Sequence, residues 1–211
     1  MHSPRRRRRR HPRPRRRTDL ARPARTFARL LVLGAALLGC QRAELPVLGT
    51  VPGFTLTERS GETVRAGDLE GSVWIAGFIF TRCPDVCPAL TARMAGLQKT
   101  LTSAGADRVR LVSFSVDPTH DSPEVLRAYA ERAGAADGWL FVTGSRDALA
   151  SLLKDGFHVA FADDGPPSAP ITHSDRLVLV DRALQIRGYY HGRDADDLER
   201  LTRDAARLRA G

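Results

Sequence analysis

Two cysteines lie four positions apart in residues 80–88 (Phe-Thr-Arg-Cys-Pro-Asp-Val-Cys-Pro), the segment of the chain best suited to chemistry. Cys83 and Cys87 follow a continuous apolar run at residues 73–80, which is typical of a strand buried on both faces. If a helix begins near Pro84, its free N–H groups and its dipole stabilise a negatively charged sulfur on Cys83. Cys87 then lies on the same helix face one turn later, so both sulfurs can approach one point.

Two sulfurs that converge on one point can form a disulfide or bind a soft metal ion. Dithiol oxidoreductases of this architecture normally have two residues between their cysteines, whereas three residues leave a wider spacing that suits a metal. Thiolates favour Cu(I), an added imidazole also suits Cu(II), and structural zinc usually needs a fourth ligand. The spacing alone leaves open a metal site, a redox-active pair and a stabilising disulfide.

A metal site would gain a third ligand from one of the histidines. His173 stands just before an apolar stretch, on a predicted loop able to lie beside the cysteines. His120 follows Asp117 and the second predicted strand, which places it at the same sheet edge and makes it the rival candidate. His158 lies between apolar residues and is predicted to be structural, and His191 is predicted to be exposed. The residues alone do not decide between His173 and His120.

The surrounding pattern predicts one layered α/β domain that holds the cysteines at the end of a central strand. Strands alternate with amphipathic helices, and a hairpin and a helix complete the chain. The predicted elements are a hairpin at 54–64, strands at 73–80, 109–116 and 139–142, helices at 89–101, 123–132 and 145–154, a hairpin at 176–190 and a helix at 194–208. Ser122 is predicted to cap the second of these helices, with Pro123 at its first position.

The positive charge of the chain is concentrated at its N-terminus. All 211 residues together carry +9, but residues 1–39 hold thirteen arginines and one acid, Asp19, and so carry +12. The remainder therefore carries −3 and lacks the basic surface that nucleic-acid phosphates require. The length and the 42% apolar content fit a single folded domain.

Residues 1–39 are predicted to be a cleaved signal peptide of the lipoprotein type. Nine consecutive non-polar residues at 30–38 are too few to cross about 30 Å of hydrocarbon, but they suit the apolar core of a signal. Residues 37–40 (Leu-Leu-Gly-Cys) resemble a bacterial lipobox, in which Cys40 becomes the lipidated first residue. An uncleaved signal anchor is the alternative. Both predictions tether the body to the membrane and place it outside the cytoplasm, on the periplasmic side.

Residues 40–52 are predicted to be a tether, and residues 53–211 the folded domain. If Cys40 carries lipid, its thiol is not available for other chemistry. Cys83 and Cys87 are then the two remaining thiols, and they lie in a compartment where a close pair can be oxidised or loaded with metal.

Three segments resemble the Sco (SenC) family and occur in the order that the family has. They are residues 78–88 with the two cysteines, residues 113–126 with Asp-Pro-Thr-His-Asp, and residues 172–181 with Thr-His-Ser and Leu-Val-Asp. The likeness extends from about Val51 to the C-terminus. The resemblance implies a thioredoxin-like fold with a central mixed sheet flanked by helices and an N-terminal hairpin.

The resemblance also implies a ligand set and a function. It implies that Cys83, Cys87 and His173 bind one copper ion, Cu(I) or Cu(II), and that Asp117 supports the site from just outside it. The implied role is a metallochaperone that delivers copper to, or reduces the thiols of, the Cu(A) site in a cytochrome c oxidase subunit, with other copper chaperones as further partners.

Two enzymatic alternatives use the same fold. A thiol-disulfide oxidoreductase would use Cys83 and Cys87 without metal, and His173 would then be dispensable. A peroxide-reducing relative is disfavoured because the sequence has no separate peroxidatic cysteine in an apolar, Thr-flanked loop. The same site serves copper insertion, thiol reduction and redox signalling, so the sequence does not choose among these tasks.

Overall fold

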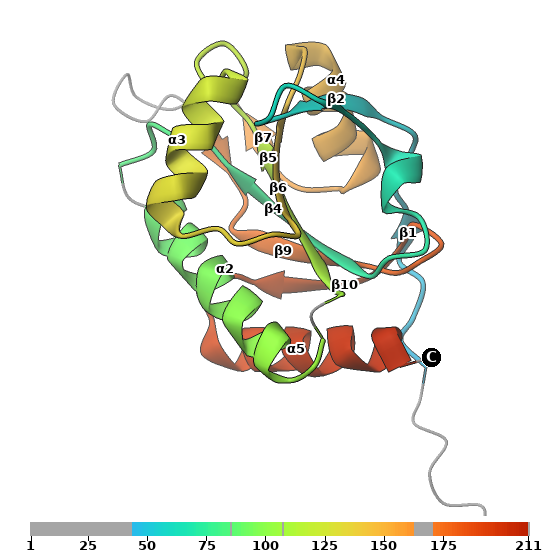
Figure 1. Cartoon of the computed structure of the whole chain (residues 1–211). Coiled ribbons are helices and arrows are strands. Elements are labelled where there is room, and N and C mark those ends of the chain that lie inside the picture. The colour runs from blue at the N-terminus through green and yellow to red at the C-terminus, as the bar shows by residue number, and fades with distance from the viewer. Residues whose placement is uncertain (1–43, 85, 107, 163–170, 211) are drawn as a thin grey trace, which may run out of the picture. The chain divides into compact units, whose positions relative to one another are not determined.

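The computed structural model describes residues 44–84, 86–106, 108–162 and 171–210. Leu45–Gly211 forms one compact unit, whose centre is a mixed sheet of eight strands in the order β1-β10-β9-β4-β5-β6-β2-β3 (Figure 1). The predicted signal peptide, Cys40 and Asp85 lie outside the described residues. None of the helices in the described part is long and apolar enough to span a membrane.

The strands of the main sheet follow the predicted order, except for β1, which the sequence analysis did not predict. They are β1 (Gly49–Thr50), β2 (Thr55–Glu58), β3 (Thr63–Arg65), β4 (Trp74–Ile79), β5 (Arg110–Ser115), β6 (Trp139–Thr143), β9 (Arg176–Val180) and β10 (Gln185–His191). The hairpin β2–β3 and the hairpin β9–β10 are both confirmed. A second, small sheet pairs β7 (Phe161–Ala162) with β8 (Thr172–His173). The sequence analysis predicted a loop, not a strand, at His173.

Helices cover both faces of the sheet. They are α2 (Val86–Ser103), α3 (Pro123–Ala133), α4 (Arg146–Ser151) and α5 (Ala195–Ala210), with a 3₁₀ turn η1 (Ala66–Leu69) and a π-helical turn η2 (Leu152–Gly156). Figure 1 shows α2, α3 and α5 on one side of the sheet and α4 on the other. Ser122 caps α3 as predicted, since its hydroxyl accepts a hydrogen bond from the backbone N–H of Val125.

The pairing of β4 explains why the sequence motifs meet. β4 runs parallel to β5 and antiparallel to β9. The carboxyl ends of β4 and β5 therefore lie at the same sheet edge as the beginning of β9. Cys83 follows β4, Asp117 follows β5, and His173 precedes β9, so the topology brings all three segments to one edge.

The core lies on both faces of β4, all six residues of which are buried. On the α4 side, the Phe157 ring lies 6.0 Å from Trp74, 5.3 Å from Phe78 and 5.2 Å from Phe114, measured between ring centroids. On the opposite side, Met94 of α2 packs against β5, and every turn of α2 buries an apolar side chain. This packing holds α2, and with it the cysteine motif, against the sheet edge.

Residues 45–52 are part of the folded unit, although they were predicted to belong to a tether. Gly49 and Thr50 pair with β10, and Val51 is 2% exposed. The guanidinium of Arg187, which is paired with Asp181, donates to the backbone carbonyl of Leu45. A two-residue strand carries too little periodicity to be recognised in a sequence, and it forms here because it completes the edge beside β10.

Candidate metal centre

The two cysteines lie on either side of the point where α2 begins. The backbone N–H of Cys83 donates to the carbonyl of Phe80 at 3.2 Å, which closes a tight turn after β4. The Sγ atom of Cys83 accepts a hydrogen bond from the backbone N–H of Cys87 at 3.4 Å. A helix leaves the N–H groups of its first turn without intrahelical acceptors, so the sulfur of Cys83 satisfies one of them.

The two thiols differ in exposure. Neither is in a disulfide, Cys83 is half-buried, and Cys87 is completely buried. Burial raises the pKa of the Cys87 thiol, because a thiolate there would lose its hydration. The Cys87 thiol therefore stays protonated at neutral pH unless a metal ion displaces the proton. Cys83 is the more accessible of the two cysteines to a reactant from solvent.

His173 lies on β8 and contacts Cys87. Its Nε2 atom is 3.2 Å from Cys87 Sγ, and its Nδ1 atom is 3.0 Å from the backbone carbonyl of Ser174. A carbonyl oxygen can only accept, so Nδ1 carries the ring proton and Nε2 presents a lone pair to Cys87. Burial lowers the pKa of His173, so the ring is neutral at pH 7 and Nε2 is available as an acceptor or a ligand.

The three predicted ligands are not yet gathered around one point. Cys87 and His173 are in contact, and Cys83 is joined to Cys87 through the backbone N–H. Within the described ranges, no three Cys, His, Asp or Glu side chains are close enough to form a ready metal-binding group. A site that uses all three residues therefore requires a rearrangement of these side chains.

Asp117 lies beside the motif and holds the residue before Cys83. Its carboxylate accepts a hydrogen bond from Arg82 Nε at 2.6 Å and one from the Thr119 hydroxyl at 2.9 Å. The Asp117 side chain is 2% exposed, whereas that of Arg82 is 46% exposed. The pair therefore anchors the Arg82 side chain to the segment after β5, although that side chain remains partly exposed to solvent.

Asp121 is a site residue that the sequence analysis did not single out. It is completely buried and accepts hydrogen bonds from the Thr81 hydroxyl at 2.6 Å, the Thr81 backbone N–H at 3.2 Å and the Ser115 hydroxyl at 2.7 Å. Burial raises its pKa, and these bonds oppose that shift. Its position in the Asp-Pro-Thr-His-Asp segment was the signal that could have identified it. The carboxylate connects the turn that precedes Cys83 to the end of β5.

The remaining described histidines are farther from this chemistry. The His120 side chain is 43% exposed, and its Nδ1 atom is 3.8 Å from Asp121. His158 is exposed and has a positive φ of 51°, so the prediction of a structural residue is wrong. His191 is exposed as predicted, and its Nδ1 atom is 3.2 Å from Asp175.

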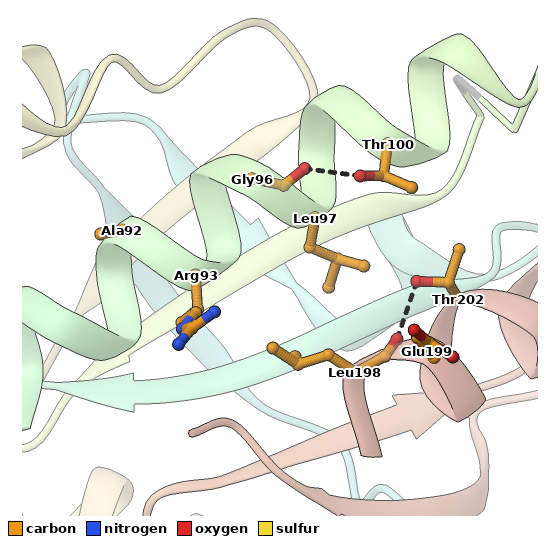
Figure 2. Close-up of a pocket in the computed structure, with 8 residues that line it drawn as sticks. All are labelled: Ala92, Arg93, Gly96, Leu97, Thr100, Leu198, Glu199 and Thr202. Carbon is orange, nitrogen blue, oxygen red and sulfur yellow. Dashed lines mark hydrogen bonds between the residues drawn. The ribbon is translucent and has the colours of Figure 1, made fainter. Parts of the chain in front are cut away.

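A groove between α2 and α5 lies apart from the motif. Figure 2 shows its lining, in which Thr100 donates to the Gly96 carbonyl and Thr202 to the Leu198 carbonyl. These hydroxyls are satisfied within their own helices. None of the described residues that line this groove is a cysteine or a histidine, so it offers no soft-metal ligands.

The sheet order and the Cys-x₃-Cys turn at the start of a helix define a protein of the thioredoxin-like class, with a histidine segment at the same edge. The SCO1/SenC family model matches residues 45–209 of this chain, which therefore belongs to that family. The prediction of family and fold class is confirmed.

Individual relatives agree with this assignment. The SCO1 protein homolog of Bacillus subtilis (strain 168) is 41% identical over 118 residues, which are 56% of this chain and 61% of that protein's length. A SCO1/SenC family lipoprotein from Bacillus anthracis str. Ames has a TM-score of 0.73 and 34% identity, over 79% of this chain and 99% of that one.

Two further structures link the fold to redox and metal chemistry in other proteins. BsSco, described with a disulfide switch and as a member of the Sco family of cytochrome c oxidase assembly proteins, has a TM-score of 0.68 and 32% identity, over 79% of this chain and 99% of that one. Arabidopsis thaliana ScoI with copper bound has a TM-score of 0.67 over 77% of this chain and 100% of that one, and its 22% identity shows the shared fold.

Proposed function

We propose that this protein binds one copper ion through Cys83, Cys87 and His173 and takes part in assembling the Cu(A) site of cytochrome c oxidase. The observation that carries the proposal is the 3.2 Å contact between His173 Nε2 and Cys87 Sγ. A thiol sulfur and an imidazole nitrogen, distant in sequence, meet there; Cys87 is completely buried and His173 is half-buried. The relatives described as cytochrome c oxidase assembly proteins and as copper-bound structures support the choice of metal and acceptor.

The donor set fits copper. Two thiolates and one neutral imidazole are ligands that Cu(I) and Cu(II) accept, and the pattern lacks the fourth ligand of a structural zinc site. The Ser174 carbonyl fixes the ring proton on Nδ1, so Nε2 needs no deprotonation to act as a ligand. Three ligands leave a position open for a thiolate or imidazole of an acceptor, so copper can pass between proteins by ligand exchange.

The two cysteines also make copper binding redox-dependent. If Cys83 and Cys87 lose two electrons and two protons to an oxidant and form a disulfide, both thiolates are removed from the ligand set. The same pair would allow the second candidate function, thiol-disulfide exchange with the acceptor. The half-buried Cys83 favours that candidate, because its sulfur can be attacked from solvent while Cys87 departs into a buried position.

The decisive experiment compares wild type, His173→Ala and His120→Ala. His120 is the matched control, because it lies on the same sheet edge but its side chain is exposed. Copper affinity is measured on the reduced protein by competition with a chromogenic chelator, and disulfide reduction is measured in parallel. The proposal predicts that His173→Ala alone loses copper. If His173→Ala binds copper as wild type does and still reduces a disulfide, the oxidoreductase function replaces it.

We also propose that residues 1–39 are removed and that Cys40 is lipidated, so that the domain is anchored on the periplasmic side of the membrane. The apolar run and the lipobox-like residues 37–40 support this. Cys40→Ser is expected to move the protein from the membrane fraction to the soluble fraction if cleavage persists, or to leave an uncleaved anchor of higher mass. Wild-type protein whose mature N-terminus is not Cys40 contradicts it.

A further inference from the structure

A pocket of about 390 Å³ lies between α2 and α3, next to the cysteine motif. Thr81, two residues before Cys83, and Pro88, directly after Cys87, line one side of it. Tyr129 and Arg132 of α3 line the other. The pocket thus lies next to the segment that carries both cysteines.

Two buried hydroxyl groups face each other at this pocket. Thr91 Oγ1 and Tyr129 Oη are 2.7 Å apart, and the two residues are 4% and 8% exposed. One hydroxyl donates to the other, so the accepting hydroxyl retains a proton to donate elsewhere. Burial raises the pKa of Tyr129 to about 12, so the phenol stays protonated at neutral pH. A buried O–H donor lining a pocket favours a ligand that accepts hydrogen bonds.

A positively charged side chain, that of Arg132, lines the same pocket. The guanidinium of Arg132 lies over the Tyr129 ring, 5.8 Å from its centroid, and the side chain is exposed. In the part of the chain that the structure describes, Arg132 has no acidic partner, and none of the described lining residues is acidic. A fork of guanidinium donors beside a hydroxyl donor matches the geometry of a carboxylate.

We propose that this pocket binds a carboxylate, an Asp or Glu side chain, of the thiol-bearing protein that reacts at Cys83. The carboxylate pairs with Arg132 and accepts from the Tyr129–Thr91 hydroxyl pair, which holds the partner's cysteine against the motif. The inference rests on the proposed function in one respect, namely that a protein thiol meets Cys83. It adds the chemistry by which that partner is selected.

The test uses two peptide disulfides that differ in one group. The peptides are Cys-Gly-Gly-Glu and Cys-Gly-Gly-Gln, each acetylated at its N-terminus and amidated at its C-terminus. Each is activated as a mixed disulfide with thiopyridine. The Cys83 thiolate attacks the peptide sulfur, a protein–peptide disulfide forms, and the peptide–thiopyridine bond breaks to release thiopyridone, which is followed by absorbance. The reduced, copper-free domain is used, and the ratio of the Glu rate constant to the Gln rate constant is the readout.

The structure predicts a ratio of about ten or more in wild type, the value of one charge-assisted hydrogen bond, and a ratio near one in Arg132→Gln. Arg93→Gln, which removes the same charge from α2 at the groove of Figure 2, should keep the wild-type ratio. Tyr129→Phe should lower the ratio without changing net charge.

Equal ratios in wild type and Arg132→Gln, or an equal fall in Arg93→Gln, overturn the proposal. Copper affinity is measured separately, so failure of this inference is distinguished from failure of the proposed function.

Discussion

His173 Nε2 lies 3.2 Å from Cys87 Sγ, although 86 residues separate the two in the sequence. The contact exists because β9 is antiparallel to β4, so the segment before β9 returns to the edge at which the cysteine helix starts. The Cys87 thiol donates to the ring, and the Nδ1 proton is held by Ser174. A metal ion that displaces the thiol proton would find the sulfur fully buried and the imidazole half-buried.

Copper affinity is expected to rise with pH. The raised pKa of Cys87 means that this thiol is protonated before copper binds and must release its proton. The lowered pKa of His173 means that the imidazole is already neutral and releases none. Each released proton raises the apparent affinity roughly tenfold per pH unit. Chelator competition between about pH 6 and pH 8 measures the slope. A flat profile would show that Cys87 does not bind the metal as a thiolate.

Gly192→Ala is expected to separate the histidine segment from the cysteine helix. A Cβ atom at this position would collide with Leu90 of α2 and would lie 2.9 Å from the Asp175 backbone carbonyl. Leu90 is three residues after Cys87, and Asp175 is two residues after His173. Overpacking of this kind costs about 1–3 kcal/mol in the free energy of unfolding. Urea unfolding measures that cost, and copper affinity should fall in the same variant.

Gly96→Ala, within α2, is the control for adding a methyl group where there is room, because a Cβ atom there meets nothing within 4 Å. It should keep the copper affinity of wild type and should be no less stable, because alanine favours a helix interior more than glycine does. A Gly192→Ala protein that equals Gly96→Ala in both measurements would contradict the role assigned to this close approach.

Asp121→Asn is expected to loosen the turn before Cys83. The carboxylate has two oxygen atoms that accept hydrogen bonds, whereas the amide has one such oxygen and an N–H₂ group that can only donate. At least one of the hydrogen bonds from Thr81 and Ser115 is therefore lost in a buried place. A loss of about 2 kcal/mol in unfolding free energy follows. Thr81→Val removes one donor, the Thr81 hydroxyl, and leaves the carboxylate in place, so it should cost about half as much. Equal losses would show that the carboxylate does not organise the turn.

The sequence was sufficient to predict what depends on periodicity and on strand order. The buried run at β4, the Ser122 cap and the final amphipathic helix follow local rules. The meeting of Cys83, Asp117 and His173 at one edge follows from the parallel and antiparallel pairing of neighbouring strands.

The sequence was not sufficient for contacts between distant side chains. The bond between Asp121 and Thr81 spans 40 residues, and nothing in either segment predicts the other's position. The two-residue strands β1, β7 and β8 form because a neighbouring strand supplies their hydrogen bonds, so no local sequence pattern predicts them. The groups that fix the turn before Cys83 and the acceptor that fixes the His173 tautomer therefore became visible only in three dimensions.

The Tyr129 hydroxyl is expected to make the domain less stable at alkaline pH. Its pKa is raised from about 10 to about 12, mainly by burial, so the folded state favours the neutral phenol. The stability linked to this group is complete below pH 10 and is lost as the pH rises toward 12. Tyr129→Phe removes the phenol hydroxyl, so the unfolding free energy of this variant should fall less over that interval than that of wild type.

Spectrophotometric titration of both proteins isolates Tyr129, because the sequence holds three tyrosines and the difference between the two curves contains this one alone. Identical alkaline stability profiles would show that Tyr129 ionises freely, and the hydroxyl pair beside the cysteine motif would then not be the buried donor that the pocket requires.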